Sequence, residues 1–359
     1  MVRKALIFSQ DVGGAKFLSP VIKNLIKMGP CDFEVIAHPL SEDAFDSMGI
    51  PYHRLADAVG PPPIKEASWA DFTQEKMISH ILCTTSSTYR DLSNSNLIRC
   101  ANAMEIPCLG VMDHWKGFDR FFDGSGSASY LPEFIGCIDE FCKKRLLELY
   151  KTSDRIFVIG HPFLEMVKRR FKKNRKRKKG IINIALASQP DTRDSEFTSI
   201  FLKKIGERSL ADVIAESVKS LKSECSINLW YQPHPKEKRM EVFPGAIRIF
   251  SGVDILADND IFIGFDSMLL VEAFLSGGFS VSLRLPEISN LSDAAIPYNY
   301  SAVVDDSEDL TAVLDESVKK IFRNERFNDR SIFPIDNSIG RATAAFKDFF
   351  NKEKVHYEK

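Results

Sequence analysis

The chain has 359 residues, of which 44% are apolar and 27% are charged, which is ordinary for a folded globular protein. This length exceeds what one hydrophobic core normally organises and predicts two domains. No apolar run reaches the roughly 20 residues that a membrane span needs, and no export cleavage site follows Met1. We therefore expect a cytoplasmic protein.

The seven cysteines are scattered, odd in number and without a Cys-x-x-Cys pair. This pattern argues against a disulfide framework and against a zinc site. The segment Asp258-Asn259-Asp260 has two carboxylates in the Asp-x-Asp spacing of a metal site, but it leads into a strand and does not follow one, so we expect a turn there. We expect no metal and no cofactor.

The net charge is −1, but ten basic residues and no acid stand between Lys168 and Lys179. Such a run can hold a protein at an anionic inner-membrane surface, or it can be a solvated linker. Nucleic-acid binding is not favoured, because no aromatic residues are interleaved with the charges.

Short apolar runs alternate with helical patterns throughout the first half of the chain. This alternation predicts a parallel, doubly wound α/β sheet. The expected strands are residues 4–9, 33–38, 52–55, 80–84, 107–112, 134–138 and 155–159.

A second strand series begins at residue 181, after the basic segment. We expect an N-terminal Rossmann-like domain at residues 1–162 and a basic helix or linker at 163–180. A C-terminal Rossmann-like domain follows at 181–335, and a last helix within 336–359 packs back on the first domain. The predicted fold class is α/β, with two doubly wound parallel-sheet domains that face a cleft.

The turn after the first strand contains Asp11, Gly13 and Gly14. Glycines at this place let the backbone approach a ligand or a neighbouring helix closely. The Gly-x-Gly-x-x-Gly pattern of dinucleotide-binding proteins is absent, which argues against NAD.

In the second half, an apolar strand at 227–231 stops at Pro233, His234 and Pro235, because prolines end ladder pairing. A further strand, 260–265, leads to Ser267, which is placed to cap a helix that begins at Met268. Helix N-termini at the carboxyl edge of an open sheet favour phosphate.

A His-Pro after one strand and a Ser before a helix with Glu272-Ala273 resemble the donor-binding half of GT-B glycosyltransferases. More narrowly, they resemble bacterial sialyltransferases and Kdo transferases, which use CMP-sugars, and glycerophosphate polymerases, which use CDP-glycerol. Gly160-His161-Pro162 resembles the end of the N-terminal domain in such enzymes. In them the His and the Ser contact the nucleotide phosphates, and an acid on the helix contacts a ribose or sugar hydroxyl.

The resemblance implies a metal-independent transfer of a sugar from a CMP- or UDP-linked donor to a glycan or lipid-linked acceptor in surface polysaccharide assembly. The sugar that we favour is a nonulosonic acid. The residues expected to bind the donor are His234, Pro235, Gly264, Ser267, Met268, Glu272, Gly13 and Gly14.

Glycosyl transfer needs a base for the acceptor hydroxyl. Asp11, at the end of the first strand, is the first candidate, although residues 10–13 only approximate the acidic segment of the resembling sialyltransferases. Asp113 and His114 form the second candidate pair, and His234 is a candidate to protonate the leaving phosphate.

Three alternatives remain open on the same fold. The first is a non-hydrolysing UDP-sugar 2-epimerase, although its Gly-Thr-Arg-Pro-Glu segment is missing after the first strand. The second is a glycerophosphate transferase that uses CDP-glycerol. The third is a non-catalytic protein that binds nucleotide sugars.

Overall fold

The structure is a computed structural model that describes residues 4–86, 91–171, 180–188, 204–221, 225–233, 246–248, 254–265, 267–286, 296–323, 325 and 330–351. The chain forms two compact units. The first comprises Met1–Met166 together with Pro334–Lys359, and the second comprises Val167–Phe333. No helix among the described residues is long and apolar enough to cross a membrane.

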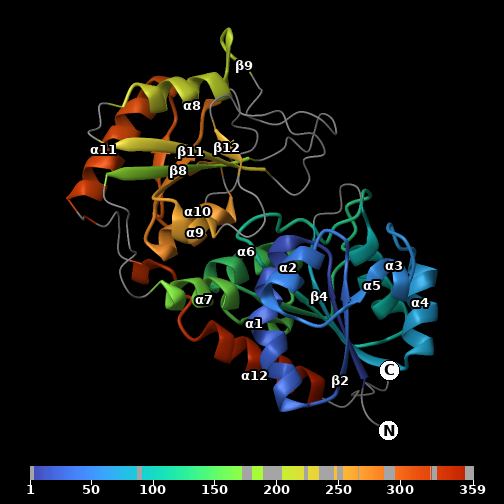
Figure 1. The fold of residues 1–359 in the computed structure, drawn as a ribbon. Coiled ribbons are helices and arrows are strands. Elements are labelled where there is room, and N and C mark those ends of the chain that lie inside the picture. Colours follow the sequence, from blue (N-terminus) through green and yellow to red (C-terminus); the bar gives the residue numbers. More distant parts are fainter. Residues whose placement is uncertain are drawn as a thin grey trace. The chain divides into compact units, whose positions relative to one another are not determined.

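The first unit is built on a parallel sheet of seven strands in the order β3-β2-β1-β4-β5-β6-β7 (Figure 1). Each strand pairs in parallel with its neighbours, and the carboxyl ends of all seven strands therefore lie at one edge. The strands are β1 (Lys4–Ser9), β2 (Asp32–Ala37), β3 (His53–Arg54), β4 (Ile78–Thr84), β5 (Cys108–Val111), β6 (Phe134–Cys137) and β7 (Ile156–Val158).

Helices α4 (Glu66–Glu75) and α5 (Ser93–Ala103) belong to one hydrophobic core with Leu6, Phe8 and Ile81 of the strands. Trp69 of α4 is fully buried and meets the Phe8 ring edge-on at 5.1 Å between ring centroids. Its indole N–H donates to the Ser93 carbonyl oxygen (2.8 Å), so the polar group of the ring is satisfied inside the core.

Helices α1 (Val12–Met28) and α12 (Ser338–Asn351) pack against each other in this unit, as Figure 1 shows. Phe349 and Phe350 of α12 are buried, and their rings meet the His80 ring of β4 at 5.3 and 6.1 Å. The remaining elements are α2 (Glu42–Met48), α3 (Leu55–Ala58), α6 (Glu140–Tyr150), η1 (Ser153–Arg155) and α7 (Pro162–Arg170), which begins in this unit.

The second unit has a parallel sheet of six strands in the order β12-β11-β8-β13-β14-β15. The strands are β8 (Ile181–Ala187), β11 (Ser226–Gln232), β12 (Ile247–Arg248), β13 (Ile261–Gly264), β14 (Phe279–Leu283) and β15 (Ala302–Val304). A short antiparallel pair, β9 (Lys204–Ile205) and β10 (Arg208–Ser209), precedes α8.

Helices cover both faces of this second sheet (Figure 1). α8 (Leu210–Lys219) and α11 (Leu310–Phe322) pack on one face, where Ile184, Val281 and Leu283 join one core. α9 (Ile255–Asp258) and α10 (Met268–Ser276) lie on the other; η4 (Ser307–Asp309) and η5 (Arg330–Ile332) complete the unit. The two open parallel sheets confirm the predicted fold class of two Rossmann-like α/β domains.

The N-terminus of α12 is fixed by Glu165 of α7, which is only 2% exposed. Its carboxylate accepts the backbone N–H groups of Asn337 (2.9 Å) and Ile339 (2.7 Å). A helix N-terminus has free N–H groups and partial positive charge, and a carboxylate satisfies both. Gly160 has a positive φ of 83°, and an added Cβ there would clash with Ser338 of α12.

We expect Glu165→Ala to destabilise the first unit, because two N–H groups at the N-terminus of α12 would lose a charged acceptor. The loss should be about 3 kcal/mol and should lower the melting temperature of the chain by several degrees in scanning calorimetry. Glu165→Gln keeps one acceptor oxygen and should lose less. An Ala variant that melts like the wild type would contradict this role for Glu165.

Candidate functional site

The carboxyl edge of the first sheet brings together residues from three neighbouring strands. Asp11 follows β1, Ser86 follows β4 and Asp113 follows β5, and these strands are adjacent in the order β1-β4-β5. Parallel strands that end at one edge place their following residues side by side. The two carboxylates predicted as alternative bases are therefore parts of one site.

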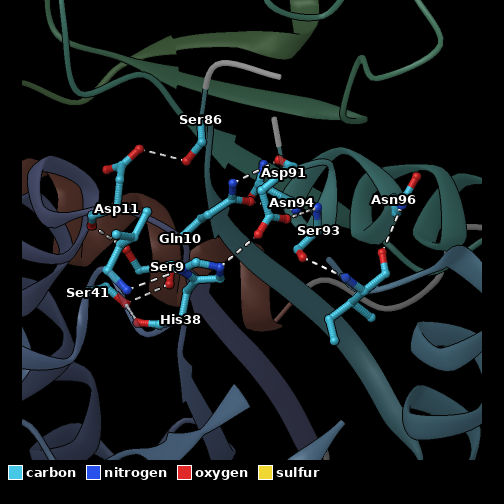
Figure 2. A network of polar contacts seen from close by, with 12 residues as sticks. Ser9, Gln10, Asp11, His38, Ser41, Ser86, Asp91, Ser93, Asn94 and Asn96 are labelled. Atoms are coloured by element: carbon cyan, nitrogen blue, oxygen red, sulfur yellow. Dashed lines mark hydrogen bonds and ion pairs between the residues drawn. The ribbon is translucent and has the colours of Figure 1, made fainter. Parts of the chain in front are cut away.

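Asp11 is the N-cap of α1. Its Oδ1 accepts the backbone N–H of Gly14 (2.8 Å), and its Oδ2 accepts the hydroxyl of Ser86 (2.6 Å). Figure 2 shows Asp11 and Ser86 facing each other across this bond. Both oxygens thus have partners within the protein, which suits a fixed charge better than a group that must take up a proton.

Asp113 lies close to Asp11 across Gly13. A Cβ added to Gly13 would lie 2.7 Å from Oδ2 of Asp113 and 3.7 Å from Oδ1 of Asp11. Gly13 is exposed, and a side chain at this position would crowd the Asp113 carboxylate. Its role in binding a ligand stays a prediction.

The pKa of Asp113 is raised from 3.8 to about 7, first because burial disfavours the charged form and second because the Asp11 carboxylate repels a second charge. The Asp113 side chain is 13% exposed. Arg120 opposes the rise, with Nη1 3.8 Å from Oδ1 of Asp113. A carboxyl with a pKa near neutrality can both accept and return a proton at physiological pH.

Arg120 is held in place by backbone oxygens. Its Nε donates to the carbonyl oxygen of Gly117 (2.8 Å), its Nη2 to that of Lys116 (2.8 Å), and its Nη1 to the carbonyl and hydroxyl oxygens of Thr85. The guanidinium therefore joins the loop after β5 to the end of β4. It supplies a fixed positive charge beside Asp113.

A buried group of rings supports the segment that carries Asp113. His161 is buried, and burial lowers its pKa to about 3, although a hydrogen bond to the backbone of Asp113 opposes the shift. Its Nδ1 accepts the N–H of Leu164 (3.3 Å), so the neutral ring is a structural support. Its ring stacks with that of Trp115 (6.4 Å between centroids), whose indole N–H donates to Oδ2 of Asp139 (2.6 Å).

His114 follows Asp113 directly and is half-buried, with its Nδ1 atom inside the protein. Gly14, in contrast to Gly13, is buried, and an added Cβ would lie 2.4 Å from Cγ2 of Thr84 in β4. Gly14 is therefore needed for close packing of α1 on the sheet, and its ligand-binding role stays a prediction.

Figure 2 shows a polar network around Gln10, the residue before Asp11, which the sequence did not predict. The Gln10 amide donates to the Asp91 carbonyl oxygen (2.9 Å) and accepts the N–H of Asn94 (2.8 Å). His38 Nε2 is 3.0 Å from Oδ2 of Asp91, and His38 Nδ1 accepts the N–H of Leu40. Burial by itself would raise the pKa of Asp91, but bonds from His38 and Ser93 together lower it to about 2.

The residues of the second unit that are predicted to bind the sugar donor lie at the carboxyl end of β13 and in the helix that follows it, α10. Gly264 ends β13, where an added Cβ would lie 3.2 Å from the Cβ of Ala187. Ser267 is the N-cap of α10, and its hydroxyl accepts the N–H of Leu269 (3.3 Å). Met268 begins the helix, and Glu272 is buried within it (6% exposed).

His234 and Pro235 lie outside the described residues, so their roles stay predictions. The strand that leads to them, β11, ends at Gln232, with Pro233 next in the chain. Among the described residues, no three His, Cys, Asp or Glu side chains are grouped so that they could hold a metal ion.

Two open parallel sheets of this kind in one chain, each with helices on both faces, are the architecture of the GT-B class, whose members include enzymes that use nucleotide sugars. No protein-family model matches this sequence, and no curated protein matches it. Its similarity to known proteins is therefore one of fold.

Among solved structures, the chain is similar to the UDP-GlcNAc 2-epimerase from Neisseria meningitidis bound to UDP-GlcNAc, with a TM-score of 0.61 and 14% identity over 98% of this chain and 100% of that one. The enzyme of the same name from Methanocaldococcus jannaschii has a TM-score of 0.61 and 13% identity, over 96% of this chain and 98% of that one. The glycosyltransferase of kitacinnamycin has a TM-score of 0.54 and 15% identity, over 97% of this chain and 96% of that one. At these identities, the similarity shows the GT-B fold.

We expect Asp11→Asn to lower the pKa of Asp113, because it removes the negative charge that helps to raise it. Burial of Asp113 remains, so the pKa should stay above the ordinary value for an aspartate. Carboxyl-carbon NMR titration of the labelled chain measures this directly. Arg120→Gln should move the same pKa upward, and a shift in the same direction for both variants would contradict the assignment.

The raised pKa also predicts how stability depends on pH. In the folded chain Asp113 titrates near 7, whereas in the unfolded chain it titrates near 4, so its contribution to stability is fully present below about pH 4 and is lost as the pH rises through 7. Asp113→Asn cannot ionise and should therefore be more stable than the wild type at pH 8, by up to about 4 kcal/mol. Denaturant unfolding should show this margin shrinking toward pH 4, and a margin independent of pH would argue against a buried ionising Asp113.

Proposed function

We propose that this chain is a glycosyltransferase that moves a sugar from a nucleotide donor to an acceptor hydroxyl, with Asp113 as the base. The observation that carries the proposal is a carboxyl at the carboxyl edge of β5 whose pKa is brought to about 7 by burial and by Asp11. A base tuned to the working pH combines a correct protonation state with enough driving force for proton transfer.

In the proposed reaction, the carboxylate of Asp113 takes the proton of the acceptor hydroxyl as its oxygen bonds to the anomeric carbon. The bond from that carbon to the donor phosphate breaks, and its electron pair leaves with the nucleotide. Asp11, fixed by Gly14 and Ser86, keeps the pKa of Asp113 high enough for this uptake. Arg120 keeps Asp113 from becoming so basic that it is always protonated.

The donor would bind to the second unit, with its phosphates at the N-terminus of α10 near Ser267 and at His234, and with a hydroxyl at Glu272. A CMP-linked nonulosonic acid remains our favoured donor, and a glycan or lipid-linked molecule our favoured acceptor. The basic run would bring the chain to an anionic membrane surface. Lys168, Arg169 and Arg170 of this run belong to α7, and residues 172–179 lie outside the described residues.

The second candidate is a UDP-sugar 2-epimerase, which the similarity to epimerase structures favours. An epimerase removes a proton from carbon and returns it without any acceptor, and a carboxyl with a pKa near 7 suits that chemistry as well. The sequence after β1, Gln10-Asp11-Val12-Gly13, differs from the epimerase segment, and therefore we place the transferase first.

The two functions are separated by incubating the purified chain in D₂O with UDP-GlcNAc or with a CMP-linked nonulosonic acid, each with and without a glycan acceptor. A transferase releases nucleotide only with acceptor and leaves the sugar unlabelled. Deuterium at C2 of UDP-GlcNAc without acceptor would establish the epimerase instead.

In whichever of these two reactions the chain catalyses, Asp113→Asn should lower kcat by roughly 10²- to 10⁴-fold, because a general base of this kind contributes that much. Asp119→Asn, an exposed acid of the same segment, is the matched control and should change kcat less than twofold. The wild-type kcat/KM should rise with pH to a plateau through an apparent pKa near 7, since the base must be ionised. Retained activity in Asp113→Asn would remove Asp113 from the mechanism.

A further inference from the structure

Strand β14 and the two residues that follow it carry a polar stripe on one face. Phe279, Val281, Leu283 and Leu285 belong to the hydrophobic core shared with α8 and α11. The alternate positions are Ser280, Ser282 and Arg284. Because side chains alternate along a strand, these three belong to the opposite face, which α10 covers.

The first member of the stripe has a partner in α10. The Ser280 hydroxyl donates to the carbonyl oxygen of Leu270 (2.6 Å), which places Ser280 level with the first turn of that helix. Each pair of residues along a strand advances by roughly 6.6 Å. Ser282 and Arg284 therefore lie successively further toward the carboxyl edge, where α10 begins.

The next two members each have a buried side-chain atom without a hydrogen bond within the part of the chain that the structure describes. Ser282 is completely buried, and its hydroxyl has no hydrogen bond there. The Nε atom of Arg284 is also buried without a hydrogen bond. The backbone N–H of Arg284 donates to the Val304 carbonyl oxygen (2.7 Å), so β15 fixes the position from which its side chain extends.

Buried polar groups without partners are costly, and a folded protein rarely keeps them unless a ligand satisfies them. A guanidinium and a hydroxyl are both donors, and the N-terminus of α10 adds partial positive charge with no acid in its first turn. These features agree on one kind of ligand, a group with negatively charged oxygens.

We propose that Ser282 and Arg284 form an anion-binding subsite at the start of α10, which takes a phosphate or a sugar carboxylate of the bound nucleotide sugar. The chemistry of the subsite follows from the unpartnered donors, whereas the identity of the ligand rests on the proposed function. Arg284 would add a forked, charged donor to the phosphate contact expected of Ser267.

The test is calorimetric titration of the full chain and of Arg284→Gln with UDP, CMP, a CMP-linked nonulosonic acid, the free nonulosonic acid and inorganic pyrophosphate. Loss of a charge-assisted hydrogen bond should weaken binding on the order of 10- to 100-fold. Arg284→Lys keeps the charge but not the paired guanidinium donors and should lose less affinity. Ser282→Ala should lower the affinity a few-fold. Arg323→Gln is the matched control, an exposed arginine of the same unit that pairs with Glu325.

The pattern of loss identifies the source of the anion. If Arg284→Gln weakens the binding of UDP, CMP and pyrophosphate alike, the subsite binds phosphate. If it weakens only the binding of the two ligands that carry the sugar carboxylate, the subsite binds that carboxylate. Equal affinity of the wild type and Arg284→Gln for every probe would overturn the proposal.

Stability without ligand provides a second measurement. Arg284→Gln and Ser282→Ala should melt at the wild-type temperature or above it, because neither side chain stabilises the fold through a described partner. A lower melting temperature for both variants would instead mean that the two residues serve the structure.

The titrations also separate this proposal from the proposed function. Binding of pyrophosphate through Arg284 without binding of any nucleotide sugar would support the subsite and contradict the transferase function. Binding of nucleotide sugars that does not depend on Arg284 would contradict the subsite and leave the transferase function standing. A wild-type chain that binds none of the probes would contradict both proposals.

Discussion

The repulsion between two neighbouring carboxylates is the interaction on which the first unit's site depends. Asp11 and Asp113 reach the same place because β1 and β5 flank β4 and all three strands end at one edge. Burial of Asp113 opposes its charge, and the Asp11 carboxylate adds to this effect. Arg120 beside Asp113 favours the charged form of that carboxyl, and the Ser86 hydroxyl donates to Asp11.

The two units show the same conflict between stability and function in different chemical forms. In the first, a carboxyl is kept where ionisation is unfavourable. In the second, donors at Ser282 and Arg284 are kept where hydrogen bonds are missing among the described residues. Strain of this kind concentrates where a protein meets a ligand. In the network around Gln10, by contrast, the Gln10 amide both donates a hydrogen bond, to the Asp91 carbonyl oxygen, and accepts one, from the Asn94 N–H.

Sequence patterns located the parts of the fold that depend on local chemistry. Ser267 predicted the start of α10, because a capping hydroxyl is a local requirement. Local sequence patterns do not show which strands lie next to each other in the sheet. Asp11 and Asp113 were treated as alternatives because 102 positions separate them, and Arg120 was missed because a loop arginine has no periodic signal.

The placement of α12 has a consequence for how the protein is made. The first unit is assembled from two segments of chain, whereas the second is one continuous segment between them. A ribosome therefore releases the whole second unit before Phe349 and Phe350 exist to cover His80 and Phe134. Until then, an apolar surface beside α1 stays uncovered, and the growing chain must hold an incomplete core. The N-terminal unit can therefore be completed only after the whole second unit has been synthesised.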